Sequence, residues 1–139
     1  MTVRIVRRFE FSAAHVLARG DWSEERNRAV YGKCANPASH GHNYGVEIAV
    51  EGAVDPKTGR ILPDGKLERI VATRVVDALD GRLLNRDVGA FAKLVPTAEN
   101  IARHIWDTLA GALSPAKLVG IRLVETRNNS VEYAGGEPI

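Results

Sequence analysis

Two stretches of this 139-residue chain alternate apolar and polar positions, the pattern of β-strands with one buried face. The first covers residues 3–15 and the second residues 40–50. The inward positions are the odd residues of the first stretch and the even residues of the second. His15 ends the first series, and His40 and His42 begin the second. We therefore expect three imidazoles at strand ends, in phase with the core.

His40 and His42 are spaced so that they could bind one metal ion together. Side chains i and i+2 of a strand share a face, about 6.5 to 7 Å apart at the backbone, and a zinc–imidazole bond is about 2.0 to 2.1 Å long. With His15 as the third ligand, one coordination position stays open, which is typical of catalytic zinc. We therefore predict Zn²⁺ bound by these three histidines. The remaining histidine, His104, is expected to be an ordinary core residue.

Cys34 is the only cysteine and precedes the histidine pair. It could be no more than a small buried hydrophobe. However, Gly32, Lys33, Asn36 and Pro37 make its surroundings a polar loop, and a thiol next to a cation can lose its proton near neutral pH. We therefore expect a thiolate beside the metal site.

The composition predicts one ordinary globular domain, residues 1–139, with 45% hydrophobic and 26% charged residues. A single cysteine excludes an internal disulfide. The absence of a leader or of an apolar run of about 18 residues predicts a cytoplasmic protein with no membrane partner. A net charge of +2 is too small to indicate a nucleic-acid partner. Arg26, Arg28 and Lys33 could attract a small anionic substrate or could simply belong to a solvated loop.

Two helices and two further strands are expected after the second strand. A turn at residues 52–59 leads to an amphipathic helix that ends at Asp80-Gly81. The second helix begins at Thr97, a good N-cap. The inward positions expected for these helices are Leu67, Ile70, Val71, Val75, Ala78 and Leu79, and Ile101, Ile105, Leu109, Ala112 and Leu113. The last two strands cover residues 119–125 and 130–134.

Glu125 continues the apolar face of its strand, which otherwise consists of Val119, Ile121 and Leu123. Burying a carboxylate costs several kcal/mol unless it is paired. We therefore expect Glu125 to have a partner at a binding site, and the alternative is a strand-end glutamate that reaches solvent.

With these motifs the chain resembles, over nearly its whole length, the family of 6-pyruvoyltetrahydropterin synthases and 6-carboxytetrahydropterin synthases, which have the tunnelling fold. The matching segments are residues 11–15, 32–44, 96–100 with Ile105-Trp106, and 125–129. The resemblance implies an α+β fold in which two helices pack on one face of a four-stranded antiparallel sheet. It also implies a β-barrel formed by three subunits and a homohexamer of two trimers, with active sites at the subunit interfaces.

The resemblance also implies the role of each site residue. His15, His40 and His42 would bind zinc, Cys34 would be the base, Glu125 would bind the pterin edge and take part in proton relay, Thr97 would line the pterin pocket, and Asp80 would belong to the relay.

The reaction implied by the resemblance is that of a lyase acting on 7,8-dihydroneopterin triphosphate. Elimination of triphosphate with internal redox gives 6-pyruvoyltetrahydropterin. Additional loss of acetaldehyde gives 6-carboxytetrahydropterin, a precursor in queuosine biosynthesis. The five residues between Cys34 and His40 are more similar to the pyruvoyl branch.

The chain departs from the family at Gly81, where the family has the relay histidine that partners Asp80. Glycine just past a helix end adopts the left-handed cap without strain, but this does not explain how the proton moves. His104 could substitute for the missing imidazole. Two alternatives follow: a homologue that acts on another pterin, as in aldolase-like side-chain cleavage, or a pterin-binding protein with little turnover.

Overall fold

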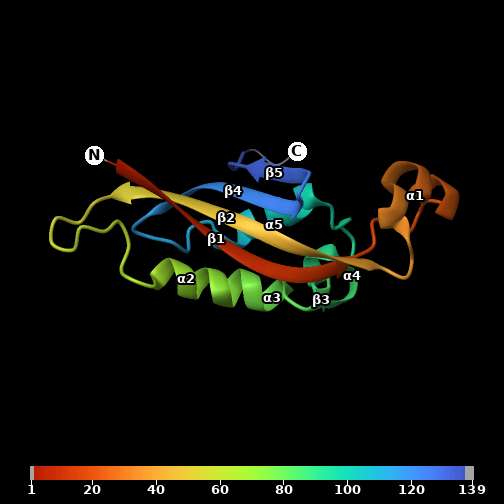
Figure 1. Ribbon diagram of the computed structural model, residues 1–139, viewed down its shortest axis with the longest axis horizontal. Coiled ribbons are helices and arrows are strands. Elements are labelled where there is room, and N and C mark those ends of the chain that lie inside the picture. Colours follow the sequence, from red (N-terminus) through yellow and green to blue (C-terminus); the bar gives the residue numbers. More distant parts are fainter. Residues whose placement is uncertain (1, 137–139) are drawn as a thin grey trace.

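The computed structural model describes residues 2–136 and places them in an α+β fold built on one twisted sheet (Figure 1). Its strands are β1 (Thr2–His15), β2 (His40–Ala53), β3 (Arg82–Leu83), β4 (Lys117–Thr126) and β5 (Asn129–Tyr133). The strand order is β3-β1-β2-β4-β5, and every neighbouring pair except β1 and β3 is antiparallel.

The sheet of the described residues therefore has five strands, and the expectation of four was wrong. The added strand, β3, runs parallel to the end of β1. Gly81, at φ 71°, turns the chain and donates its N–H to the carbonyl oxygen of Ser12 across 2.7 Å. The carboxylate of Asp80 accepts a hydrogen bond from the N–H of Ser12 at 2.8 Å. These two hydrogen bonds place the next residues beside β1. The sequence did not predict this strand because two residues are too few to show an alternation of apolar and polar positions.

The helices that cover the sheet lie on one face, as expected. A nearly continuous helix consists of α2 (Lys66–Val71), a π-helical segment (Ala72–Val76) and α3 (Asp77–Leu79), and it runs along β1 (Figure 1). Helix α5 (Ala98–Leu109) packs against β4 and β5. The largest side chains of the shared core are Tyr44, Phe91, Ile48, Leu79, Leu84, Ile101, Ile105, Leu109, Leu113, Ile121 and Leu123. No helix within residues 2–136 is long and apolar enough to cross a membrane.

The opposite face of the sheet is the more polar one, and it carries charged side chains beside apolar ones such as Val6 and Ala49. Arg4 and Glu51 form an ion pair of 2.8 Å between β1 and β2, and Arg122 and Glu47 form one of 2.6 Å between β4 and β2. At exposed positions such pairs contribute about 0 to 1 kcal/mol each. They make this face compatible with water, whereas the helix-covered face holds the core.

The segment between β1 and β2 contains a helix that the sequence did not predict. Helix α1 (Glu24–Tyr31) begins at Ser23, whose hydroxyl accepts from the N–H of Arg26 at 3.1 Å, and a 3₁₀ turn follows over Gly32–Ala35. Asn27 is the one buried residue of α1. Because α1 buries no apolar stripe, hydrophobic periodicity could not reveal it. Short helices also cover Leu84–Asp87 (α4) and Gly89–Phe91 (3₁₀).

A register shift in β4 changes which residues face the core. The pairing with β2 slips between Ala49 and Val50, so that Gly120 lies opposite Ala49 and Leu118 opposite Val50. Leu118 is therefore buried, whereas Val119 is only partly buried. The expectation that Val119 faces inward was wrong because a β-bulge changes the alternation by one residue.

Candidate metal centre

The three histidines predicted at strand ends meet at one end of the sheet. His15 lies directly opposite His40 in the pairing of β1 with β2, and His42 lies opposite Ala13. The Nε2 atom of His15 is 3.0 Å from that of His40 and 3.2 Å from that of His42. With the thiol of Cys34, the ligand atoms all lie within 4.8 Å of one another. The structure thus confirms that these four side chains form one cluster.

The cluster fits a metal ion of the zinc type. Nitrogens bound tetrahedrally at about 2.0 to 2.1 Å would lie about 3.3 Å apart, close to the observed separations. The other ring nitrogen of His15, Nδ1, lies 2.9 Å from the carbonyl oxygen of Pro96, which can only accept, so Nδ1 is protonated and Nε2 is free to coordinate. Among the described residues, Nδ1 of His40 is buried without a hydrogen-bond partner. Three imidazoles with a nearby thiol are typical zinc ligands.

The environment of His15 and His40 favours the neutral imidazole that binds metals. Burial lowers the pKa of His15, and the neighbouring histidines add to this effect, although the contact with Pro96 and the charge of Glu125 act the other way. Burial is also the largest cause that lowers the pKa of His40, followed by His42. A histidine with a lowered pKa stays neutral, and able to bind a metal, at lower pH.

Cys34 is partly buried and lies in the 3₁₀ turn after α1. Its carbonyl oxygen accepts the N–H of Leu17 at 2.7 Å, which holds the turn close to the end of β1. Burial, followed by the negative charge of Glu125, raises the pKa of the Cys34 thiol. For the protein without a bound metal ion, the expectation that Lys33 would lower the pKa of Cys34 was therefore wrong. A cation bound by the histidines would act in the opposite direction.

Glu125 lies near this cluster at the end of β4. Its Oε1 atom accepts a hydrogen bond of 3.2 Å from the side-chain amide of Asn129, and the carboxylate is partly buried. Its charge affects the pKa values of His15, Cys34, His40 and Tyr44. The partner of this carboxylate is thus the neutral side-chain amide of Asn129.

The structure gives Thr97 a definite local role. Its hydroxyl caps α5 by accepting the N–H of Asn100 at 3.2 Å. Thr97 directly follows Pro96, whose carbonyl oxygen contacts His15. The N-terminus of α5 is therefore next to the histidine cluster, and the role of Thr97 in pterin binding stays a prediction.

Asp80 and His104 are not among the side chains that the structure brings together here. Asp80 is exposed and bonds to the backbone of β1, so its catalytic role stays a prediction. His104 is half-buried on α5, where its ring packs edge-on against Phe91 with centroids 5.2 Å apart. This contact supports the interpretation of His104 as a core residue.

Tyr44 and Asn85 support the site and were not predicted to do so. The hydroxyl of Tyr44 lies 3.3 Å from Nδ1 of His15, but in the sequence Tyr44 is only one member of an apolar series. The side chain of Asn85 bonds to both backbone groups of Val16, at 2.8 and 2.9 Å. A single asparagine in the short helix α4 gives no sequence signal for such a contact.

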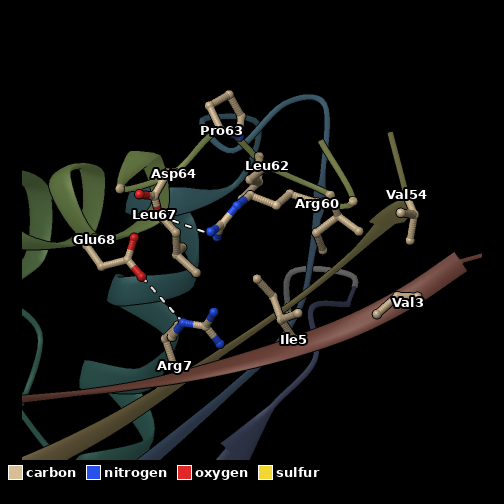
Figure 2. A pocket seen from close by; sticks show the side chains of 13 residues that line it. Val3, Ile5, Arg7, Val54, Arg60, Leu62, Pro63, Asp64, Leu67 and Glu68 are labelled. Atoms are coloured by element: carbon tan, nitrogen blue, oxygen red, sulfur yellow. Dashed lines mark ion pairs between the residues drawn. The ribbon is translucent and has the colours of Figure 1, made fainter. Parts of the chain in front are cut away.

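A separate hollow of about 230 Å³ lies at the other end of β1, between this strand, the loop after β2 and the start of α2 (Figure 2). Its walls combine apolar side chains with the ion pairs Arg7–Glu68 and Arg60–Asp64, each 3.4 Å long. Its lining contains no histidine or cysteine. The hollow therefore has no set of soft metal ligands, unlike the cluster around His15.

Comparisons with known proteins agree with the motifs. The family model described as 6-pyruvoyl tetrahydropterin synthase matches residues 4–136. The 6-pyruvoyl tetrahydrobiopterin synthase of Pongo abelii is 41% identical over 132 residues, which are 95% of this chain and 91% of the relative. The solved 6-pyruvoyl tetrahydropterin synthase of Caenorhabditis elegans superposes with a TM-score of 0.91 at 35% identity, covering 98% and 97% of the two chains. A dihydroneopterin monophosphate aldolase of Pyrococcus furiosus is 32% identical over 133 residues, 95% of this chain and 97% of the relative.

Proposed function

We propose that this chain, which belongs to the 6-pyruvoyl tetrahydropterin synthase family, is a zinc-dependent lyase. Its proposed reaction converts 7,8-dihydroneopterin triphosphate to 6-pyruvoyltetrahydropterin. The observation that carries this proposal is the convergence of three imidazoles and one thiol within 4.8 Å. Such a cluster combines a metal position with a potential base, the two groups that the reaction needs.

His15, His40 and His42 would bind the zinc ion through their Nε2 atoms. Bound zinc would supply a Lewis acid that polarises the hydroxyl oxygens of the substrate side chain and makes the adjacent C–H bonds more acidic. Burial lowers the pKa of both His15 and His40, which favours the neutral form of their rings and supports this assignment.

Cys34 would act as the base, and Glu125 would orient the pterin. The thiolate of Cys34 takes a proton from a side-chain carbon, and the electrons of that C–H bond move toward the pterin ring. The ring would take up one proton at N5 and, as the resulting enol tautomerises, a second at C6, so that it reaches the tetrahydro level while the side-chain carbon becomes a carbonyl. Loss of the proton on the next side-chain carbon would then expel triphosphate with the electron pair of its C–O bond, and tautomerisation of the second enol would give the second carbonyl. The carboxylate of Glu125 would accept two N–H groups at the amino-pyrimidine edge, a charge-assisted contact that fixes the register of the substrate.

The pyruvoyl product is favoured over the carboxy product. The spacing of five residues between Cys34 and His40 resembles the pyruvoyl branch, and the relative from Pongo abelii is named for that product. Formation of 6-carboxytetrahydropterin would require further C–C cleavage with loss of acetaldehyde.

A homohexamer of two trimers is the assembly that we propose. On the outer side of β1, residues 2–12 have no strand partner among the described residues, and β5 forms the other edge of the sheet. Unpaired strand edges are commonly covered by neighbouring subunits. Light scattering at micromolar concentration should show six chains, and a stable monomer would contradict this assembly.

Aldolase-like cleavage of the pterin side chain is the second candidate function. It is favoured by Gly81, which replaces the relay histidine expected of a synthase, and by the similarity to a protein named as an aldolase. Cleavage between the first two side-chain carbons would give a hydroxymethyl pterin and would leave the ring at the dihydro level. Because the two reactions give different pterins, a product assay distinguishes them.

The zinc-loaded protein should be incubated with 7,8-dihydroneopterin triphosphate and, separately, with 7,8-dihydroneopterin. We expect release of triphosphate and a tetrahydro product from the first compound. His42→Ala, which leaves two histidine ligands, should lose both zinc and turnover, whereas His104→Ala should keep its zinc. A hydroxymethyl product would favour the aldolase, and tight pterin binding without any product would favour a binding protein.

A further inference from the structure

Tyr44 is buried beside the metal ligands, but the proposed reaction gives it no role. It lies on β2, the strand that also holds His40 and His42, and its exposed fraction is 1%. Its ring stacks on Phe11 of β1 at 5.0 Å and meets the rings of His42 and His15 edge-on, at 5.6 and 6.4 Å. The ring therefore has a defined place, which fixes the direction of its hydroxyl group.

That hydroxyl group lies on the side of His15 that faces away from the cluster. Its oxygen is 3.3 Å from Nδ1 of His15, and the carbonyl oxygen of Pro96 is 2.9 Å from the same atom. Since a carbonyl oxygen can only accept, the hydrogen must be on Nδ1. The hydroxyl oxygen of Tyr44 is thus placed as a second acceptor for this hydrogen.

We infer that Tyr44 is a positioning residue of the metal centre, and that its hydroxyl keeps the ring of His15 in the tautomer and orientation that direct Nε2 toward the other ligands. This inference rests on the metal site of the proposed function. Groups that hold the second nitrogen of a ligating histidine fix its tautomer and its ring plane.

The place of Tyr44 in the fold gives His15 a contact of a different kind from that with Pro96. Pro96 belongs to the loop before α5, outside the two strands that contain the three histidines. Tyr44 is only two residues from His42 and shares its face of β2. It therefore links His15 of β1 to the strand that holds the other two histidines. By contrast, Nδ1 of His40 has no hydrogen-bond partner among the described residues.

Tyr44→Phe removes this hydroxyl and keeps the ring that packs on Phe11. Competition with a chromophoric chelator should show that the variant binds Zn²⁺ about 10- to 100-fold more weakly than the wild type. Tyr133→Phe is a matched control. Tyr133 lies on β5, where its ring packs edge-on against that of Trp106 with centroids 5.5 Å apart, so this substitution should leave the zinc affinity unchanged. In the Co²⁺-loaded proteins, the d–d bands should shift for Tyr44→Phe but not for Tyr133→Phe.

Long-range ¹H–¹⁵N NMR of the metal-free wild type gives a test that does not depend on the variant folding. We expect His15 to carry its hydrogen on Nδ1, and a hydrogen on Nε2 would overturn the inference. Unchanged zinc affinity of a folded Tyr44→Phe would also overturn it. A wild type that binds no zinc would instead overturn the metal site of the proposed function, so the two failures can be distinguished.

Discussion

The N–H of Leu17 donates to the carbonyl oxygen of Cys34 across 2.7 Å, and this bond joins the two ends of the segment that connects β1 with β2. Leu17 is two residues beyond His15, and Cys34 is six residues before His40. The bond therefore holds the thiol beside both strands that contain the histidines. The position of Cys34 depends on this closure and on Asn85, which binds both backbone groups of the neighbouring Val16.

Cys34→Ala should show whether Cys34 acts as a base or as a metal ligand. If the thiolate only removes a proton, the variant keeps its zinc and its pterin affinity, and turnover falls about 10² to 10⁴-fold. Metal analysis, calorimetry and steady-state rates measure the three quantities. Loss of zinc from Cys34→Ala would show instead that the thiol is a fourth ligand, because it lies within the same 4.8 Å cluster.

Glu125→Gln should weaken substrate binding more than it weakens zinc binding. A neutral amide cannot make two charge-assisted hydrogen bonds to the pterin edge, so we expect a loss of about 1.5 to 3 kcal/mol in binding free energy. Calorimetry with a pterin measures this loss. Glu132→Gln on β5 is the control, since Glu132 pairs with Arg122 on the polar face of the sheet. Equal affinities of the two variants would refute the role of Glu125.

Gly81→His tests the missing relay histidine. A Cβ atom built at Gly81 meets no atom within 4 Å, so the structure has room for a side chain. The left-handed φ of 71° should lower the stability by roughly 1 kcal/mol. If an imidazole is needed here, the rate should rise, because a positioned acid or base contributes about 10² to 10⁴-fold.

Gly111→His is the matched control for the strain at Gly81. Gly111 has a φ of 78° and is equally open. It should show the same loss of stability without a change in rate. A fast wild type that Gly81→His does not accelerate would mean that another group, or water, already serves as the relay.

The alternation of apolar residues predicted the histidine cluster because a strand places i and i+2 on one face, and the register of β1 with β2 brings His15 opposite His40. The same reasoning failed at Val119, because a bulge depends on how two strands pair. Helix α1 and strand β3 were missed for a related reason. Capping by Ser23 and the contacts of Ser12 stabilise them, and neither element has an apolar repeat.

His104 should make the stability fall in mild acid. Burial is the largest cause that lowers its pKa below 6.5, against an opposing effect of Asp107. The unfolded chain therefore takes up a proton at a higher pH than the folded protein does. The free energy of unfolding should then decrease as the pH falls below about 6.5, until the pH passes the folded-state pKa.

His104→Gln removes this titration. Urea midpoints of the metal-free proteins at pH 7.5 and pH 5.5 should show a smaller fall for the variant than for the wild type. The other three histidines are the same in both proteins, so the difference between the two falls in urea midpoint isolates the effect of His104. Equal falls would show that burial of His104 has no effect on acid stability.

The three histidines that we propose as zinc ligands come from two adjacent strands, and they lie near the end where these strands separate. A bound ion would therefore stabilise the pairing of β1 with β2 at this end. The pairing at the far end, near Thr2 and Ala53, would not be stabilised by the ion. Removing the ion should let the last few backbone pairs fray while the remaining sheet stays closed. Amide hydrogen exchange should accordingly speed up near Ala14 and Gly41 long before the global unfolding limit is reached.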